Sequence, residues 1–322
     1  MNITENDNSK TYEDLSKLRE SIQALYIGQK EVIDQVLVSF LAKGHVLLEG
    51  VPGLGKTLLV KIIAKLIDAE YSRIQFTPDL MPADVTGHML YDHQTGSFKV
   101  NKGPVFTNLL LTDEINRSPA KTQAALLEVM EEMQVTLDGT PLKIKAPFMV
   151  LATQNPIEQE GTYNLPEAQL DRFLLKVNID YPDEEDETKL LNVIAKGDLK
   201  VKLEELEHVM DIESVLHLQE QCKKVLVDDS IQKYILDIVR ATRDCDTISY
   251  GAGPRGGISL INCCRAYALL QNREYVIPDD VKEMVLPVLR HRIIISPEYE
   301  LAGTTPDSIL LGLMNKIPAP RQ

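Results

Sequence analysis

The feature that most constrains this chain is the run Gly-Val-Pro-Gly-Leu-Gly-Lys-Thr at residues 50–57, which fits G-x-x-x-x-G-K-[ST] in full. Residues 45–49 before it predict a short strand, and residues 58–67 after it are apolar at helical spacing. In that context the run predicts a phosphate-binding loop rather than a chance glycine-rich turn, because backbone N–H groups and the helix N-terminus both face the anion. Lys56 is expected to reach the β- and γ-phosphates of ATP, and the Thr57 hydroxyl to bind Mg²⁺. The candidate nucleotide-binding residues of the loop are Gly50, Val51, Pro52, Gly53, Leu54, Gly55, Lys56 and Thr57.

A second apolar strand is expected at residues 108–112, and it delivers two acids, Asp113 and Glu114, at its carboxyl end. Ligands of open α/β sheets gather at that edge. Asp113 would hold Mg²⁺ directly or through water, and Glu114 would polarise the attacking water as a general base. Acids often follow buried strands simply as solvated residues. Beside a phosphate-binding loop, however, the pair predicts a site for Mg-ATP hydrolysis.

The domain organisation follows from length and patterning. A chain of 322 residues is longer than a typical domain of about 100–200 residues. Strand and helix patterns alternate to about residue 182, which predicts a parallel sheet covered by helices on both sides. After an acidic run at 183–187 the pattern is helical, with no convincing series of strands. We therefore expect a disordered tail at residues 1–14, an α/β core at 15–182 and a helical domain at 183–322.

Composition restricts the class of protein. The formal net charge of −14 argues against broad nucleic-acid binding, although a local basic stripe can exist within an acidic total. No apolar run approaches the roughly 18–20 residues that a membrane span needs, and the N-terminus does not resemble a secretory signal. The cysteines form no C-x-x-C pair, so we expect buried free thiols in a reducing cytoplasm rather than disulfides or a metal site. They are Cys222, Cys245, Cys263 and Cys264.

Three further polar residues follow the two motifs along the chain. Asn155 follows a strand expected at residues 148–153, Arg172 follows an aspartate, and Arg255 lies in Gly-Pro-Arg-Gly. Taken singly, they would be read as a turn asparagine, a surface ion pair and a loop arginine. In this order, after a phosphate-binding loop and an acid pair, they resemble the motifs of the AAA+ ATPases.

The AAA+ resemblance implies a role for each residue. Asn155 corresponds to sensor 1, which orients the attacking water and contacts the γ-phosphate. Arg172 corresponds to the arginine finger, which stabilises charge on the phosphoryl group of ATP held by the neighbouring subunit. Arg255 corresponds to sensor 2, which couples the lid to nucleotide state. Ile27 and Gly28, which interrupt a helical pattern, are also candidate nucleotide-binding residues. The implied fold is a five-stranded parallel sheet in an αβα sandwich followed by an all-helical lid, with ATP between them.

Longer strings resemble the MoxR branch of the AAA+ ATPases over about residues 20–320. That family implies an insert within about 79–104 and a hairpin before sensor 1 at about 135–146. A mild departure is the glycine-rich Gly-Ala-Gly-Pro-Arg-Gly-Gly around Arg255, where serine and alanine are expected. The strings that carry the resemblance lie at residues 73–87, 113–117, 119–123, 131–136 and 165–173.

The MoxR resemblance implies a ring, most simply a hexamer, with a chaperone-like role in remodelling or maturing a client protein. Partners in this family often carry a von Willebrand A domain. Three alternatives remain open: a nucleic-acid-associated motor, a chelatase-like metal-insertion subunit and a non-hydrolysing nucleotide switch. The sequence lacks the Gly-Ala-Phe-Thr-Gly-Ala loop of sigma-54 activators. Arg117 is either a surface residue or a residue that reaches across the subunit interface.

Overall fold

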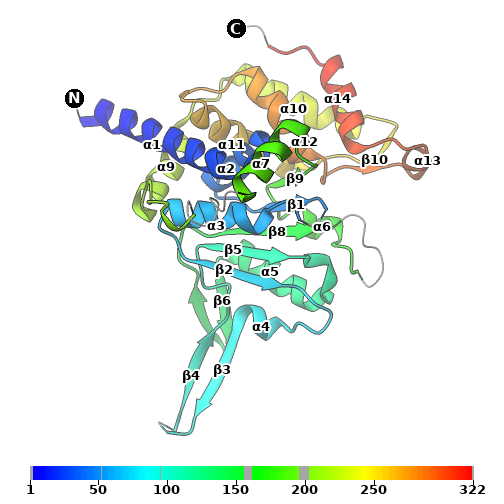
Figure 1. Cartoon of the computed structure of the whole chain (residues 1–322). Helices are drawn as coiled ribbons and strands as arrows, with labels where there is room; N and C mark the ends of the chain where they lie inside the picture. Colours follow the sequence, from blue (N-terminus) through cyan, green and yellow to red (C-terminus); the bar gives the residue numbers. More distant parts are fainter. Residues whose placement is uncertain (1–2, 52, 95, 156–161, 196–202, 321–322) are drawn as a thin grey trace.

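The computed structural model describes residues 3–51, 53–94, 96–155, 162–195 and 203–320, with side chains from residue 12 onward. A central sheet has helices on both faces, a mainly helical domain packs at one end, and a long hairpin projects at the other (Figure 1). None of the described helices is long and apolar enough to cross a lipid bilayer.

The central sheet is five-stranded and parallel, as predicted, with the strand order β2-β5-β8-β1-β9. Successive residues of a strand point to opposite faces. On β5, Leu109 and Leu111 therefore join the apolar cluster on one face, whereas Leu110 joins the cluster on the other. The strands are β1 (Val46–Glu49), β2 (Tyr71–Gln75), β5 (Leu109–Asp113), β8 (Met149–Gln154) and β9 (Leu175–Asn178).

Helices cover both faces of the sheet. One face packs against α2 (Lys30–Leu41) and α3 (Lys56–Leu66), and α1 (Ile3–Leu25) packs on these two helices. The other packs against α5 (Ala120–Glu132), which follows the short 3-10 helix η1 (Ile115–Arg117). The short helix α6 (Glu167–Leu170) precedes β9.

The expected disordered tail is wrong from residue 3 onward, because α1 begins at Ile3. Leu15, Leu18 and Ile22 are buried at helical spacing and anchor the second half of this helix on the core. Once a helix is nucleated, further turns at its end add hydrogen bonds at little cost, so a polar sequence can continue it.

Two hairpins extend from the core. The first lies in the segment expected as an insert and comprises α4 (Pro82–Thr86), β3 (Gly87–Asp92) and β4 (Ser97–Lys102). The ribbon of β3 and β4 projects well beyond the sheet (Figure 1). The second pairs β6 (Gln134–Leu137) with β7 (Thr140–Lys143).

Within the described residues 184–195 and 203–320, the C-terminal lid is mainly helical and contains a short antiparallel pair, β10 (Ile248–Tyr250) with β11 (Ile294–Ile295). This pair departs from the all-helical lid expected, because strands of two or three residues leave no readable alternation in a sequence. The lid helices are α7 (Glu184–Ala195), α9 (Ile212–Lys224), α10 (Asp229–Arg243), α11 (Pro254–Leu270), α12 (Pro278–Leu289), α13 (Pro297–Leu301) and α14 (Pro306–Lys316).

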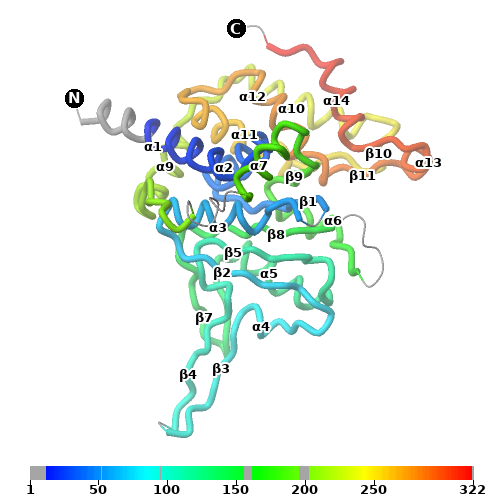
Figure 2. The backbone as a smooth tube through the Cα atoms, viewed as in Figure 1, coloured from blue at the N-terminus to red at the C-terminus, as the bar shows by residue number. Residues whose placement is uncertain are grey.

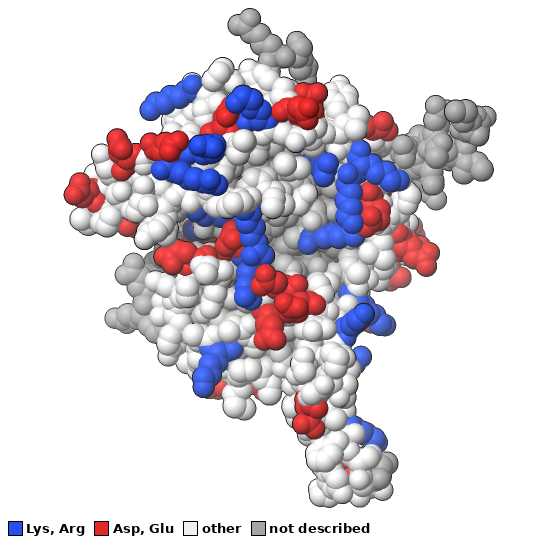
Figure 3. Space-filling model, turned by 180° about the vertical axis from the view of Figure 1, so that it is seen from behind, with Lys and Arg blue, Asp and Glu red and all other residues white. Residues whose placement is uncertain are grey.

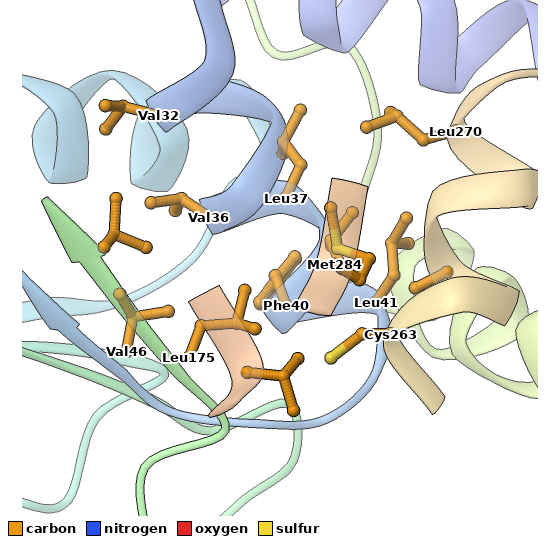
Figure 4. Close-up of a cluster of buried hydrophobic side chains, with 14 of the residues drawn as sticks. Val32, Val36, Leu37, Phe40, Leu41, Val46, Leu175, Cys263, Leu270 and Met284 are labelled. Carbon is orange, nitrogen blue, oxygen red and sulfur yellow. The ribbon is translucent and has the colours of Figure 1, made fainter. Parts of the chain in front are cut away.

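The lid and the core share one hydrophobic cluster. α11 packs on α2, and α12 packs on β9, although these segments are far apart in the sequence (Figure 2). Phe40 and Leu41 of α2 meet Leu175 of β9, Cys263 of α11 and Met284 of α12 in this cluster (Figure 4). The lid is therefore seated directly on the face of the sheet that α2 covers.

Candidate nucleotide-binding site

The phosphate-binding loop closes tightly between β1 and α3. A Cβ on Gly50 would lie 2.5 Å from the carbonyl oxygen of Ile179, so any larger residue would clash with backbone. Gly55 has φ +74° and occupies the N-cap of α3, a conformation that glycine adopts without strain. The loop thus directs the N-terminus of α3 toward the carboxyl edge of the sheet. Pro52 lies outside the described residues.

Lys56, the first residue of α3, is folded back over the loop. Its Nζ donates a hydrogen bond to the carbonyl oxygen of Gly50 at 2.6 Å. Partial burial lowers the pKa of Lys56, while nearby Asp113, Glu114 and Glu49 oppose that shift. The ammonium group of Lys56 therefore lies between the loop and the carboxylates at the ends of β1 and β5, in a position to bind a polyphosphate.

Tyr26 supports the loop from the end of α1. Its hydroxyl donates to the carbonyl oxygen of Leu54 at 2.9 Å, and burial raises the pKa of this tyrosine to about 12. Ile27 and Gly28 follow directly and form the turn into α2, where Gly28 has φ +76° and lies against Asp186 and Pro182. Ile27 and Gly28 do not line the cavity described below. The adjacent Tyr26, however, holds the phosphate-binding loop in place.

A cavity lies beside the loop at the carboxyl edge of the sheet. The strands that end there are β1, β2, β5 and β8. Every described residue that lines this cavity belongs to the core. The lining residues are Gly50, Gly53, Leu54, Gly55, Lys56, Thr57, Arg73, Gln75, Asp113, Glu114, Thr153, Gln154 and Asn155.

Asp113 is buried at the end of β5 and is held by two neighbours. Arg73 Nε donates to Asp113 Oδ2 at 2.7 Å, and Thr153 Oγ1 lies 3.4 Å from Asp113 Oδ1. Thr57 lines the same cavity. A carboxylate and a hydroxyl are oxygen ligands of the type that Mg²⁺ prefers, so Thr57 and Asp113 fit this ion together with phosphate oxygens.

Glu114 is held by two side chains that bond one oxygen of its carboxylate. Gln75 Nε2 donates to Glu114 Oε2 at 2.7 Å, and Arg117 Nη1 donates to the same oxygen at 2.8 Å. The backbone N–H of Glu114 donates to Thr153 Oγ1 at 2.9 Å. Asn155 is buried and lines the same cavity. The structure thus brings together Lys56, Thr57, Asp113, Glu114 and Asn155.

Arg172 and Arg255 lie elsewhere, as a pair. Arg172 Nη2 is 3.2 Å from Glu131 Oε2, and Arg255 Nη2 is 3.5 Å from Glu131 Oε1. Arg255 Nε also lies 3.8 Å from Asp171 Oδ2. Neither arginine lines the cavity, and in particular the structure does not bring Arg255 to the nucleotide site of its own chain. Both side chains are partly exposed, so a second molecule can reach them.

The sequence analysis missed several residues of the site, among them Tyr26, Arg73, Gln75 and Thr153. Arg73 and Gln75 lie on β2, two positions apart and separated by the buried Ile74. That alternation predicts a strand with one polar face. It does not reveal which strand lies beside β2 in the sheet. Only the register, with Gln75 opposite Asp113, places them at the acid pair.

A phosphate-binding loop, an acid pair and a polar residue at one edge of a five-stranded parallel sheet, followed by a helical lid, define an AAA+ ATPase. A family model described as "ATPase family associated with various cellular activities (AAA)" matches residues 45–175, and one described as "AAA lid domain" matches residues 240–311.

Similar proteins narrow the class. An uncharacterized protein of Bacillus subtilis, YeaC, is 46% identical over 96% of this chain and 95% of its own. Chaperone MoxR1 of Mycobacterium tuberculosis is 39% identical over 93% of this chain and 81% of its own. A crystal structure described as a candidate ATPase of Cytophaga hutchinsonii superposes with a TM-score of 0.91 at 40% identity, covering 99% of this chain and 98% of that one. The chain belongs to the MoxR family of AAA+ ATPases.

Proposed function

We propose that this chain hydrolyses Mg-ATP and uses the energy to remodel or mature a client protein. The observation that carries the proposal is the convergence of Lys56, Asp113, Glu114 and Asn155 on one cavity at the carboxyl edge of the sheet. Each supplies a different part of phosphoryl transfer: charge on the phosphates, a metal ligand, a base and a polar contact to the γ-phosphate.

Thr57 and Asp113 would hold Mg²⁺ beside the phosphates of ATP. The ion neutralises charge on the phosphate oxygens when bound. Arg73, whose Nε lies 2.7 Å from Asp113 Oδ2, orients that carboxylate in the cavity. The loop N–H groups and Lys56 orient the phosphates above the acid pair.

Glu114 accepts a proton from the attacking water, whose oxygen bonds to the γ-phosphorus as the bond to the bridging oxygen of ADP breaks. Gln75 and Arg117 fix one oxygen of its carboxylate. Asn155 orients the water and contacts the γ-phosphate. The products are ADP and phosphate.

The site is completed by a neighbouring subunit in a ring, which we propose to be a hexamer. Arg172 stabilises the charge on the phosphoryl group of the neighbour's ATP. Its separation from the cavity of its own chain, together with its partial exposure, supports action across an interface. Arg255 shares Glu131 with Arg172, so we place it on the same interface.

The client is a protein rather than a nucleic acid in this proposal. The net charge is −14, and on the face in Figure 3 basic side chains are interspersed with acidic ones rather than joined in a continuous band. A client carrying a von Willebrand A domain is one candidate, by family analogy. The four cysteines are free thiols, which is consistent with the cytoplasmic location that we propose.

A trap experiment tests the proposal. Glu114→Gln should bind ATP but hydrolyse it about 100-fold more slowly or worse, because the carboxamide cannot accept the proton. Lys56→Ala should lose ATP affinity and serves as the control. ATP-locked Glu114→Gln is then used to capture partners from the native cell, and the bound material is identified by mass spectrometry.

Each outcome of the trap experiment supports a different function. A protein retained by Glu114→Gln and absent from Lys56→Ala supports a remodelling role. Retention of nucleic acid alone, with a salt-dependent gel shift, would instead favour a motor. Stimulation of the ATPase by a transition metal would favour a chelatase-like subunit. Background hydrolysis by the unmodified chain at every protein concentration would favour a nucleotide switch.

A further inference from the structure

The turn that carries Arg172 is held by the lid of the same chain. This turn, residues 171–174, joins α6 to β9. Arg292, in the loop between α12 and β11, has a side chain only 3% exposed and points its guanidinium into the turn. Its Nε donates to Asp171 Oδ1 at 2.7 Å, and its Nη2 donates to the carbonyl oxygens of Phe173 at 2.8 Å and Asp171 at 3.3 Å. Its Nη1 donates to the carbonyl oxygen of Leu174 at 3.0 Å.

A second lid residue contacts the same turn. His291 is buried, and its Nε2 lies 3.1 Å from the carbonyl oxygen of Phe173, within hydrogen-bonding distance. Arg255, from the start of α11, pairs with Asp171 from the solvent side. Three lid residues thus surround the turn on which Arg172 stands.

The planar guanidinium of Arg292 is well suited to holding the turn at residues 171–174. A fork of donors with fixed geometry can bond the Asp171 carboxylate and three carbonyl oxygens together, which the single ammonium group of a lysine cannot do. Since burying an arginine is costly unless its hydrogen bonds are made, the turn and the loop of Arg292 are expected to move as one unit.

We propose that Arg292 is a positioning residue for Arg172, so that the lid of each subunit sets the arginine that acts on the neighbour's ATP. The inference rests on the proposed function, because it assumes that Arg172 works across the interface. Any displacement of α11 and α12 is transmitted through Arg292 to Arg172 and changes catalysis in the next subunit. The linkage gives the ring a route for passing nucleotide state from one subunit to the next.

Arg292→Lys keeps the charge and removes the fork. We expect kcat for ATP hydrolysis to fall by about 100-fold, because a displaced catalytic group costs that much for a shift of about 1 Å. The KM for ATP should stay within about twofold, since Arg292 is remote from the cavity that binds it. Asp171→Asn, at a partly exposed residue, keeps the fork of Arg292 and removes the charge of its carboxylate partner, and it should lower kcat in the same direction.

Mixing subunits separates this proposal from the proposed function. Arg172→Ala subunits mixed with Lys56→Ala subunits should regain activity, because an intact cavity then faces an intact arginine; failure there, or no hydrolysis by the unmodified chain, would count against the proposed function itself. Given that control, Arg292→Lys or Asp171→Asn mixed with Lys56→Ala should also regain activity.

Three results would overturn the role of Arg292 while the proposed function stands. One is an unchanged kcat for both Arg292→Lys and Asp171→Asn. The second is an equal change in KM and kcat. The third is a loss of kcat that Lys56→Ala subunits do not restore, which would mean that Arg292 serves only its own chain or its folding. Circular dichroism melting of each variant shows whether the subunits being mixed are folded.

Discussion

At the scale of single residues, the acid pair is organised before substrate binds. Glu114 has φ +56°, a left-handed conformation that costs a non-glycine residue roughly 1–3 kcal/mol. The turn directs its side chain to Gln75 and Arg117, while its N–H bonds Thr153. A carboxylate fixed in this way needs no reorganisation when the water arrives, which is the condition for electrostatic preorganisation.

The buried side chain of His45 predicts that the folded protein loses stability in acid. Its Nδ1 accepts a hydrogen bond from the N–H of Val150 at 3.0 Å, and its Nε2 lies 3.2 Å from the carbonyl oxygen of Met130. Complete burial lowers the pKa of His45 from 6.5 to about 4. The unfolded chain therefore binds the proton first, so the stability that neutral His45 contributes is fully present above about pH 6.5 and is lost as pH falls toward 4.

The expected loss on His45 is roughly 2 kcal/mol of unfolding free energy between pH 7.5 and pH 5. Urea unfolding at the two pH values measures it. His45→Asn should show a smaller pH dependence than the unmodified chain, whereas His88→Asn, at an exposed histidine, should show the same dependence. An identical dependence in all three proteins would rule out His45 as a source.

At the scale of elements, the projecting ribbon of β3 and β4 has two unlike faces. Directly opposed residues share a face, so Met89 and Tyr91 lie with Val100 and Phe98. The rings of Tyr91 and Phe98 are 5.2 Å apart, and Phe98 is 64% exposed. In Figure 3 most of the projecting tip is uncharged. An apolar surface of this kind on a projecting arm suits contact with another protein.

Phe98→Ser should reduce client retention by the ATP-locked Glu114→Gln trap several-fold, because it removes the most exposed aromatic ring of the apolar face. The ATPase activity and the unfolding midpoint should stay unchanged, since exposed substitutions cost within about 0.5 kcal/mol. Lys99→Ser, opposite Leu90 on the other face, is the matched control. Equal retention by the two variants would show that this face does not bind the client.

Local sequence motifs identify some residues of this site, whereas others are placed there only by the packing of distant elements. Lys56, Asp113 and Glu114 were predictable because each lies in a short local pattern whose strand or helix is also local. Gln75 was not, since its place depends on β2 lying beside β5 in a register that no local pattern encodes. Arg255 matched a motif, yet its distance from the cavity depends on how the lid packs on α2 and β9, which is a long-range result.

At the scale of the whole molecule, the shared cluster makes core and lid one cooperative unit. Leu41 of α2 is 2% exposed and lies among lid and core side chains (Figure 4). Leu41→Ala should lower the unfolding free energy by about 2–5 kcal/mol and shift a single transition. Leu301→Ala, at a residue 90% exposed, should change it by less than about 0.5 kcal/mol. Calorimetry that resolves separate core and lid transitions would contradict this expectation.

If ATP hydrolysis needs an arginine from a second subunit, as we propose, the specific ATPase activity must depend on protein concentration. Phosphate release per subunit should rise with concentration in step with assembly measured by analytical ultracentrifugation, while Arg172→Ala should stay low at every concentration. A specific activity that is the same at all concentrations, including those at which the chain is monomeric, would show that a single subunit hydrolyses ATP without a neighbour's arginine.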